Sequence, residues 1–306
     1  MIGDALLRRE LQTRMAGKIL FDEPAACHTS IGVGGPIDVL LFPESEAEIA
    51  DIVDCLHKKG MPFFPVGNWT NLIVRDAGYR GVLVSLARLR NLILRDEGKG
   101  SALLLAEAGC PLSELVSRSA DQALKGMEFC AGIPGSVGGA VRMNAGAYGG
   151  EIKDVVESVL LLDAPGAVRT AARQDLHFAY RHLDLPVETI IISAAFRLHR
   201  GNREEIDGRI REIMQMRCKK HPLEFRNAGS IFKNPRDCPA GRLIEAAGLK
   251  GARIGDAQVS EKHANFIVNR GQARADEIER LMALVQIQVQ ERTGYRLEPE
   301  VKIIGE

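Results

Sequence analysis

The stretch that most constrains this chain is GIPGSVGGAVRMNAGAYGG, at residues 132–150. It holds seven glycines, a density that a regular helix or strand interior does not tolerate without a specific reason. Glycine lets the backbone approach a flat or anionic ligand closely, Pro134 stiffens the turn, and Ser136 can donate a hydrogen bond. A glycine-rich packing crossover with no ligand is the alternative. The stretch therefore predicts close approach, either to a ligand or to another part of the backbone.

A second loop, Gly67-Asn68-Trp69-Thr70-Asn71, directly follows a short apolar run that reads as a strand at 63–66. Backbone N–H groups at a glycine turn, together with Thr and Asn side chains, suit a pyrophosphate, although a plain tight turn explains the same residues. Together the two loops indicate a dinucleotide. No GxGxxG lies between a strand and a helix, so a classical Rossmann dehydrogenase is disfavoured.

Composition excludes several classes of protein. Forty basic and forty acidic residues among 306 leave no overall field to attract nucleic acid. The six cysteines form no CxxC pair, so no zinc knuckle, redox dithiol or other metal site is expected. No run of eighteen apolar residues is present, and the N-terminal MIGDALLRRELQTRM has no cleavage site for a signal peptide. We expect a protein that keeps its N-terminus, stays in the cytoplasm and does not span a membrane.

Periodicity predicts a mixture of helices and strands, hence an α+β protein. Ser45 and Glu48 form a possible capping box for a helix that Gly60 ends. A domain boundary is expected near Gly201, where β-rich sequence gives way to helix. Further helices are expected from Leu112 to a stop at Gly126, along a stripe of Ile206, Ile210, Ile213 and Met214, and at 276–292 with Gly294 as the stop; further strands are expected at 72–74, 82–84, 103–105, 155–162, 189–198 and 300–304.

The third notable motif is NAGSIFKNP, at residues 227–235. Its Ser230 is flanked by Gly229 and followed by Lys233 and Asn234, a pattern that also suits a surface turn. It is not a GxSxG nucleophile elbow, so an esterase serine is not indicated.

The ordered set of motifs resembles one family, the UDP-N-acetylenolpyruvoylglucosamine reductases, which are flavoenzymes of peptidoglycan precursor synthesis. The resemblance runs from about Thr29 to Ile304. It rests on TSIGVGGPIDVL, PVGNWTNLIV, GMEFCAGIPGSVGGAVRMNAGAYGGEI, FAYRHL, NAGSIFKNP, AAGLKGARIGDAQVSEKHANFIVN and LEPEVKIIG, in the order of the family.

The resemblance implies a two-part FAD-binding module of the vanillyl-alcohol-oxidase/p-cresol-methylhydroxylase type and a C-terminal α+β substrate-binding domain. The domains would cover residues 1–85, 86–202 and 203–306. Trp69 is a departure, because the family usually has a small residue there. The implied FAD-binding residues are Gly67, Asn68, Thr70, Asn71, Gly132, Ile133, Pro134, Gly135, Ser136, Gly139, Asn144, Ala145 and Gly146.

The implied reaction is reduction of the enolpyruvyl double bond of UDP-N-acetylglucosamine enolpyruvate, with NADPH as the reductant and FAD as the carrier. By motif position Arg181 would stabilise developing negative charge, Ser230 would donate the proton, and Glu300, if protonated, would donate a hydrogen bond. From the residues alone, Arg181 could equally form a surface ion pair and Glu300 could be a solvated strand residue. Glu298 shares a strand face with Glu300, so only the resemblance chooses between them.

The resemblance also implies residues that bind the substrate. The positions that match those for its diphosphate and sugar are Arg217, Lys219, Asn234, Lys250 and His263, and Tyr180 is a further implied substrate-binding residue. Lys219 and Lys220 could instead be the solvated end of a helix. The short interval between Arg181 and Ser230 matches the variant of the family that lacks an extra tyrosine loop. Two alternatives remain, an FAD oxidase of the same fold and a flavin-binding protein without chemistry. A monomer is expected.

Overall fold

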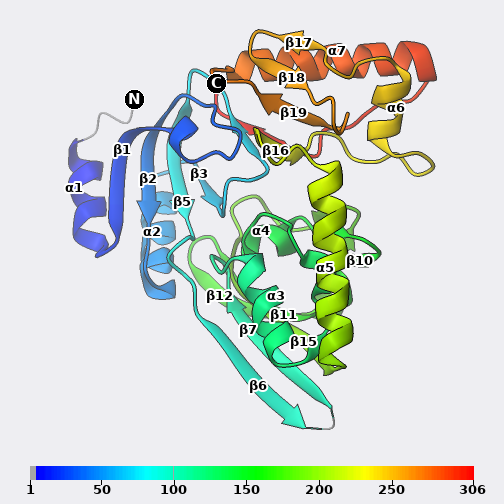
Figure 1. Cartoon of the computed structure of the whole chain (residues 1–306). Coiled ribbons are helices and arrows are strands. Elements are labelled where there is room, and N and C mark those ends of the chain that lie inside the picture. The colour runs from blue at the N-terminus through cyan, green and yellow to red at the C-terminus, as the bar shows by residue number, and fades with distance from the viewer. Residues whose placement is uncertain (1–4, 99) are drawn as a thin grey trace. The chain divides into compact units, whose positions relative to one another are not determined.

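The computed structural model describes residues 5–98 and 100–306 (Figure 1). The prediction that the N-terminus is retained concerns residues 1–4 in particular, which lie outside the described residues. The chain forms two compact units. Unit 1 comprises the chain up to Phe21 together with Val39–Asn68 and Gly81–Met216, and unit 2 comprises Asp22–Asp38, Trp69–Arg80 and Arg217–Glu306. The predicted three domains follow a different division, and they stay a prediction.

The smaller sheet has the strand order β1-β2-β5-β3. Its strands are β1 (Lys18–Pro24), β2 (Pro36–Phe42), β5 (Tyr79–Ser85) and β3 (Phe63–Val66), and β3 runs parallel to β5. Helices α1 (Ala5–Arg14) and α2 (Glu46–Lys58) accompany it. Ser45 caps α2 as predicted, because its side chain accepts from Glu48 N. The Glu48 carboxylate accepts from Glu44 N rather than from Ser45, so only half of the predicted capping box forms.

The larger sheet of unit 1 has the order β12-β11-β15-β7-β6 and is antiparallel throughout. Its strands are β12 (Ala167–Ala172), β11 (Val156–Asp163), β15 (Ile190–Arg200), β7 (Ser101–Glu107) and β6 (Leu92–Gly98), and β8 (Leu124–Lys125) also pairs with β15. Helices α3 (Leu112–Asp121), α4 (Val137–Arg142) and α5 (Arg203–Lys220) belong to the same part of the chain. Two short hairpins join β9 (Gly146–Ala147) to β10 (Gly150–Glu151) and β13 (Phe178–Ala179) to β14 (His182–Leu183).

Helix α4 lies inside the glycine-rich stretch, where the glycine density argued against regular structure. Its Gly138 explains why a helix is possible there: a Cβ at this position would lie 2.8 Å from the Ala108 Cβ. The glycine therefore lets α4 pack closely against the end of β7. Close packing against another part of the backbone therefore explains one of the glycines in this stretch.

The predicted end of α3 is wrong. The helix stops at Asp121 rather than running to Gly126. Ala123 takes a left-handed φ of 51° and donates its N–H to Ala120 O, and Leu124 then pairs with Arg200 of β15. Pairing with a distant strand therefore ends the helix before the glycine does.

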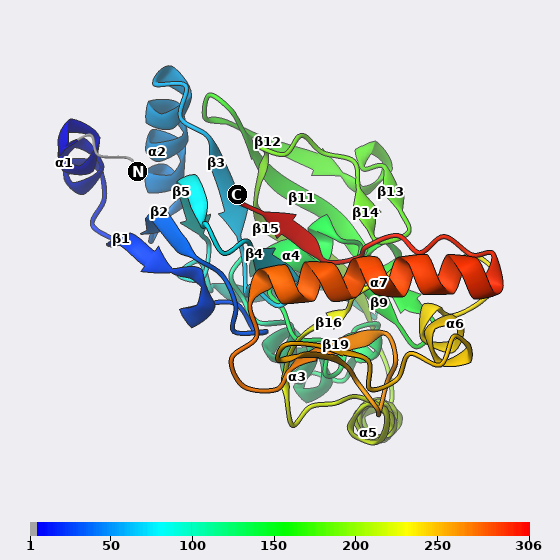
Figure 2. The same ribbon diagram turned by 90° about the horizontal axis from the view of Figure 1, so that it is seen from above.

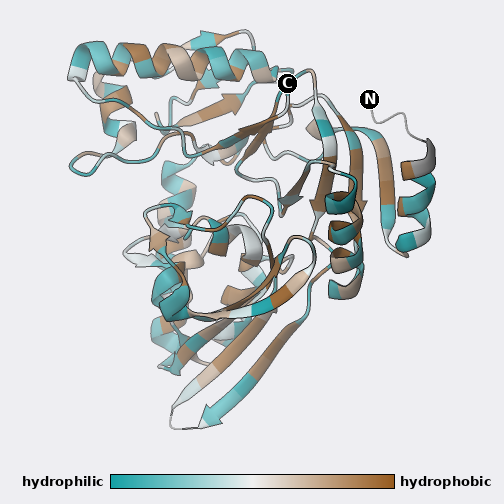
Figure 3. Ribbon diagram, turned by 180° about the vertical axis from the view of Figure 1, so that it is seen from behind, coloured by the Kyte–Doolittle hydropathy of each residue, from teal (hydrophilic) through white to brown (hydrophobic). Residues whose placement is uncertain are grey.

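Unit 2 contains a four-stranded antiparallel sheet of order β16-β19-β18-β17, with α7 (Ala275–Thr293) packed along β17 and β18 (Figure 1). The other elements are β16 (Arg226–Ser230), α6 (Ala240–Ala246), β17 (Arg253–Ile254), β18 (Ala257–Val259), β19 (Phe266–Asn269), and the parallel pair β4 (Leu72–Val74) and β20 (Lys302–Ile304). Hydrophobic and hydrophilic residues alternate along α7 (Figure 3), and Ile278, Leu281 and Val285 are buried. Gly294 ends α7 as predicted, with φ 77° and its N–H on Gln290 O.

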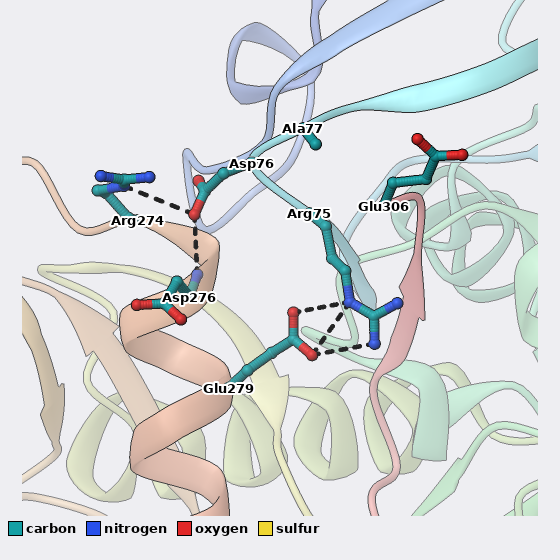
Figure 4. Close-up of a pocket in the computed structure, with 7 residues that line it drawn as sticks. All are labelled: Arg75, Asp76, Ala77, Arg274, Asp276, Glu279 and Glu306. Atoms are coloured by element: carbon teal, nitrogen blue, oxygen red, sulfur yellow. Dashed lines mark hydrogen bonds and ion pairs between the residues drawn. The ribbon is translucent and has the colours of Figure 1, made fainter.

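The N-terminus of α7 borders a cavity of about 550 Å³ in which Asp76 pairs with Arg274 and Arg75 pairs with Glu279 (Figure 4). The Asp76 carboxylate accepts from Ala275 N at 3.1 Å and from Asp276 N at 3.0 Å, so it caps the helix from a distant loop. The Arg75 guanidinium donates to both carboxylate oxygens of Glu279. These contacts give the cavity a structural role in starting α7.

Among the described residues, no helix is both long and apolar enough to cross a membrane.

Candidate active site

A small cavity of about 100 Å³ in unit 1 is lined by residues from both of the predicted flavin-binding loops. Its lining includes Gly67 from the first loop and Ser136 and Gly139 from the second. The other lining residues are Phe64, Pro65, Val66, Leu86, Ala108, Gly138, Arg142, Val187, Thr189 and Ile191. Strand β3 and helix α4 thus bring together residues far apart in the sequence.

Ser136 is a polar residue that lines this cavity. It is 3% exposed, and its Oγ has no hydrogen-bond partner within residues 5–98 and 100–306. A Cβ on Gly67 would lie 2.3 Å from this Oγ, so only glycine at position 67 leaves room for the hydroxyl. Ser136 occupies the N-cap position of α4 but does not cap it. A buried hydroxyl without a partner is costly, and a bound oxygen acceptor would satisfy it. The site therefore fits the phosphate or another oxygen of a dinucleotide.

The remaining predicted cofactor residues fall into four groups. Gly132, with φ 69°, and Gly135, with φ 157°, form the turn that leads into α4, and Ile133 and Pro134 lie between them. Asn68 is exposed at the end of the unit 1 segment. Thr70 and Asn71 belong to unit 2, whereas Asn144, Ala145 and Gly146 follow α4 in unit 1.

Trp69, the departure from the family pattern, has φ 55° and is 7% exposed. Its ring lies against that of His28, with centroids 5.4 Å apart. A left-handed backbone favours glycine, so Trp69 is an unusual residue at this φ. In this chain burial of the indole offsets the backbone cost.

Asn71 forms hydrogen bonds with the segment that contains the predicted catalytic residue Glu300. Its Nδ2 donates to Glu300 O at 3.1 Å, and its own carbonyl accepts from Lys302 N.

Arg181 lies in the two-residue turn between β13 and β14, which are paired in Figure 2. Its φ is 55°, a strained value for a residue with a long side chain. The guanidinium donates to Gly146 O at 2.7 Å and lies 4.9 Å from the centre of the Tyr180 ring, and the Tyr180 side chain is itself exposed. A strained backbone that presents a fixed cation is typical of a functional position.

Ser230 and Glu300 come from adjacent segments of unit 2. Ser230 ends β16 beyond an irregularity in its pairing with β19, and Glu300 N donates to Ile231 O at 2.7 Å. Both residues are half-buried. Glu298 is exposed and forms an ion pair of 3.5 Å with Lys233. The structure therefore places Glu300 beside the segment that follows Ser230 and gives Glu298 a surface contact; the final strand begins at Lys302 rather than at the predicted Glu300.

The predicted substrate residues of unit 2 are only partly available to a ligand. Lys250 pairs with Glu245 at 2.8 Å, and Asn234 Oδ1 accepts from Ala240 N at 2.9 Å. Lys219 is exposed near the end of α5, and Arg217 begins the C-terminal segment of unit 2. His263 packs edge-on against the His221 ring, with centroids 5.6 Å apart.

Sequence reasoning missed His221 and Arg142. The Nδ1 of His221 is buried with no hydrogen-bond partner in the part of the chain that the structure describes, and burial followed by the charge of Arg217 lowers the pKa of this imidazole to about 4. Arg142 lines the same cavity as Ser136 and donates to the carbonyls of Leu185 and Pro186. The signal for Arg142 was present in the sequence, because it is the one charged residue within positions 132–150.

Comparison with known proteins identifies the family. Residues 221–304 match the C-terminal domain of UDP-N-acetylenolpyruvoylglucosamine reductase, and residues 36–172 match an FAD-binding domain. The enzyme of that name from Syntrophus aciditrophicus is 49% identical over 306 residues, covering 100% of this chain and 98% of the relative. The chain belongs to the UDP-N-acetylenolpyruvoylglucosamine reductase family.

Two further relatives agree with this membership. The reductase from Caldanaerobacter subterraneus is 46% identical over 291 residues, covering 95% of both chains. The crystal structure of the Thermus caldophilus reductase superposes with a TM-score of 0.79 at 34% identity, covering 95% of this chain and 100% of that one. The predicted family and the predicted α+β fold, an FAD-binding module followed by the family's C-terminal domain, are both confirmed.

Proposed function

We propose that this protein reduces UDP-N-acetylglucosamine enolpyruvate to UDP-N-acetylmuramate, with NADPH as reductant and FAD as carrier, in peptidoglycan precursor synthesis. Family membership over the whole chain supports the substrate and the reaction. The cofactor assignment is supported by the buried Ser136 hydroxyl, which lies against Gly67 and has no hydrogen-bond partner among the described residues. A buried hydroxyl next to a glycine suits an oxygen-bearing ligand held close to the backbone. A cytoplasmic monomer with three domains, 1–85, 86–202 and 203–306, completes the proposal.

Gly67, Ser136 and Gly139 would hold the cofactor through close backbone approach and one hydroxyl donor. Asn68, Thr70, Asn71 and the turn at 132–135 would contribute further contacts. When bound there, FAD would supply the hydride chemistry that links NADPH to the terminal alkene carbon of the substrate.

The protein's own residues manage the charge and the proton that this chemistry requires. Addition of hydride leaves negative charge on the neighbouring carbon, delocalised into the substrate carboxylate. Arg181 would pair with that carboxylate through its guanidinium, which remains protonated, and so stabilise the developing dianion. Ser230 would give its hydroxyl proton to the carbon, completing the reduced C–C bond. Glu300, in its protonated form, would donate a hydrogen bond to the enolate oxygen.

Tyr180, Arg217, Lys219, Asn234, Lys250 and His263 would contact the rest of the substrate, with the cationic residues on its diphosphate. Lys250 would then exchange its contact with Glu245 for a phosphate oxygen.

The purified protein tests the proposal directly. It should carry a yellow flavin spectrum, and under anaerobic conditions it should oxidise NADPH in amounts greater than its own flavin content only when UDP-N-acetylglucosamine enolpyruvate is present. A colourless protein contradicts the cofactor assignment. Rapid NADPH oxidation that needs oxygen but not the UDP sugar would indicate an oxidase of the same fold instead.

A further inference from the structure

We propose that Asn144 is a positioning residue that presents Arg181 to the substrate, through a clasp between the segment 144–146 and the turn 179–181. The inference rests on the proposed function, because it assigns Asn144 to the step in which Arg181 stabilises charge. All the residues involved belong to unit 1.

The Asn144 side chain is completely engaged within the protein. It is 0% exposed, and its Nδ2 donates to Glu151 Oε2 and to Ala179 O, both at 2.9 Å. Its Oδ1 accepts from Lys153 N at 3.0 Å. Both donors and the carbonyl of the amide are thus satisfied, which leaves this side chain little capacity for a cofactor.

A second hydrogen bond joins the same two segments with donor and acceptor reversed. Arg181, two residues after Ala179, donates to Gly146 O, two residues after Asn144, at 2.7 Å. Each segment therefore offers a side chain to the other's backbone carbonyl. Ala179 also pairs with His182 across the hairpin, so the amide of Asn144 holds the base of the turn that carries Arg181.

Both segments have unusual backbones, which indicates that the clasp is imposed by the structure around it. Asn144 has φ 42° and Arg181 has φ 55°. Asparagine tolerates the left-handed region, whereas a long side chain pays a cost there. A Cβ on Gly146 would lie 2.7 Å from Gly150 O, so the acceptor for Arg181 is also fixed in place. Preorganisation of this kind is what a charge-stabilising arginine needs.

Glu151 adds an electrostatic part to the clasp. Burial opposes its ionisation, but hydrogen bonds from Lys153 and Asn144 and the charge of Arg181 outweigh burial and lower the pKa of Glu151. An ionised Glu151 therefore accepts from Asn144 and lies within the field of Arg181.

Two variants separate this role from cofactor binding. Asn144→Asp keeps the shape of the side chain and removes both donors, and Asn144→Gly removes the side chain at a backbone angle that glycine adopts freely. Anaerobic rapid mixing then measures flavin reduction by NADPH and flavin reoxidation by the UDP sugar as separate steps.

We expect reoxidation to slow by about 10- to 100-fold, because a displaced cation loses much of its effect on the reacting group. Flavin reduction and the equilibrium affinity of the apoprotein for FAD should be unchanged. Asn269→Asp is the matched control: Asn269 is also a buried asparagine, and it donates to Ile31 O and accepts from Gly271 N and Ala273 N. That variant should lose stability without slowing reoxidation selectively.

A double-mutant cycle with Arg181→Lys completes the test. If Asn144 acts through Arg181, then Asn144→Asp should cost little in the Arg181→Lys background. Additive losses, slower flavin reduction or weaker FAD binding in both Asn144 variants would overturn the inference while leaving the proposed function intact. A wild-type protein that does not reduce the UDP sugar at all would refute the proposed function, and the inference with it.

Discussion

Replacing Ser136 with alanine should change the stability of the apoprotein and its affinity for FAD in opposite directions. The hydroxyl is 3% exposed and has no partner among the described residues, so the apoprotein bears the cost of burying it. A buried, unsatisfied hydroxyl costs about 1 to 3 kcal/mol. Ser136→Ala should therefore leave the free energy of unfolding of the apoprotein unchanged or raise it by about 1 kcal/mol.

The same substitution should weaken FAD binding. A hydrogen bond from a hydroxyl to a charged group contributes about 1.5 to 3 kcal/mol, which corresponds to a loss of affinity of roughly 10- to 150-fold. The two quantities are measured by denaturant unfolding of flavin-free protein and by flavin fluorescence on titration of that protein with FAD.

The control is Ser119→Ala, because Ser119 is equally buried but donates to Leu115 O at 2.7 Å. It should destabilise the apoprotein by about 1 kcal/mol and leave FAD affinity unchanged. The reasoning is refuted if Ser136→Ala destabilises the apoprotein as much as Ser119→Ala does, or if it binds FAD as tightly as the wild type.

Other substitutions test separate parts of the account. Asp76→Ala removes the cap at the start of α7 and should lower the free energy of unfolding by about 1 to 2 kcal/mol, measured in denaturant, with FAD affinity unchanged; an unaltered midpoint would exclude the cap. The pKa of His221 lies near 4 in the folded protein against 6.5 for a free imidazole, so the unfolded chain takes up this proton first and stability should fall as pH drops from about 6.5 to about 4. His221→Phe should flatten that part of the stability profile, and an unchanged slope would contradict the assignment. Glu300→Ala removes the proposed hydrogen-bond donor to the enolate and should lower kcat, whereas nearly full turnover would disprove the proposed role of Glu300.

Local sequence signals predicted the elements that local contacts decide. The Ser45 cap and the Gly294 stop set the limits of α2 and α7 through bonds to residues at most four positions away. The end of α3 was missed because Leu124 pairs with β15, a contact that no pattern near Gly126 encodes. Helix α4 was missed because its Gly138 is explained by close packing against Ala108, about thirty residues earlier in the chain.

The candidate site shows the same limit. The motifs predicted that Ser136 and Gly67 contact the cofactor, but only the structure shows that the Ser136 hydroxyl lies against Gly67. Asn144 was grouped with the cofactor residues by its motif, and the structure instead shows its amide bonded to Glu151 and Ala179. The stripe predicted for α5 was wrong at Met214, which is 40% exposed, because the buried face of that helix is narrower than the periodicity suggested.

The central claim is that the chain adds hydrogen across the enolpyruvyl double bond at the expense of NADPH. Mass spectrometry of an anaerobic reaction with UDP-N-acetylglucosamine enolpyruvate tests it most directly. The account predicts a UDP sugar heavier by two hydrogens, formed in equal amount to the NADPH consumed, and no such product from Ser230→Ala. Consumption of NADPH with the UDP sugar recovered unchanged would contradict it.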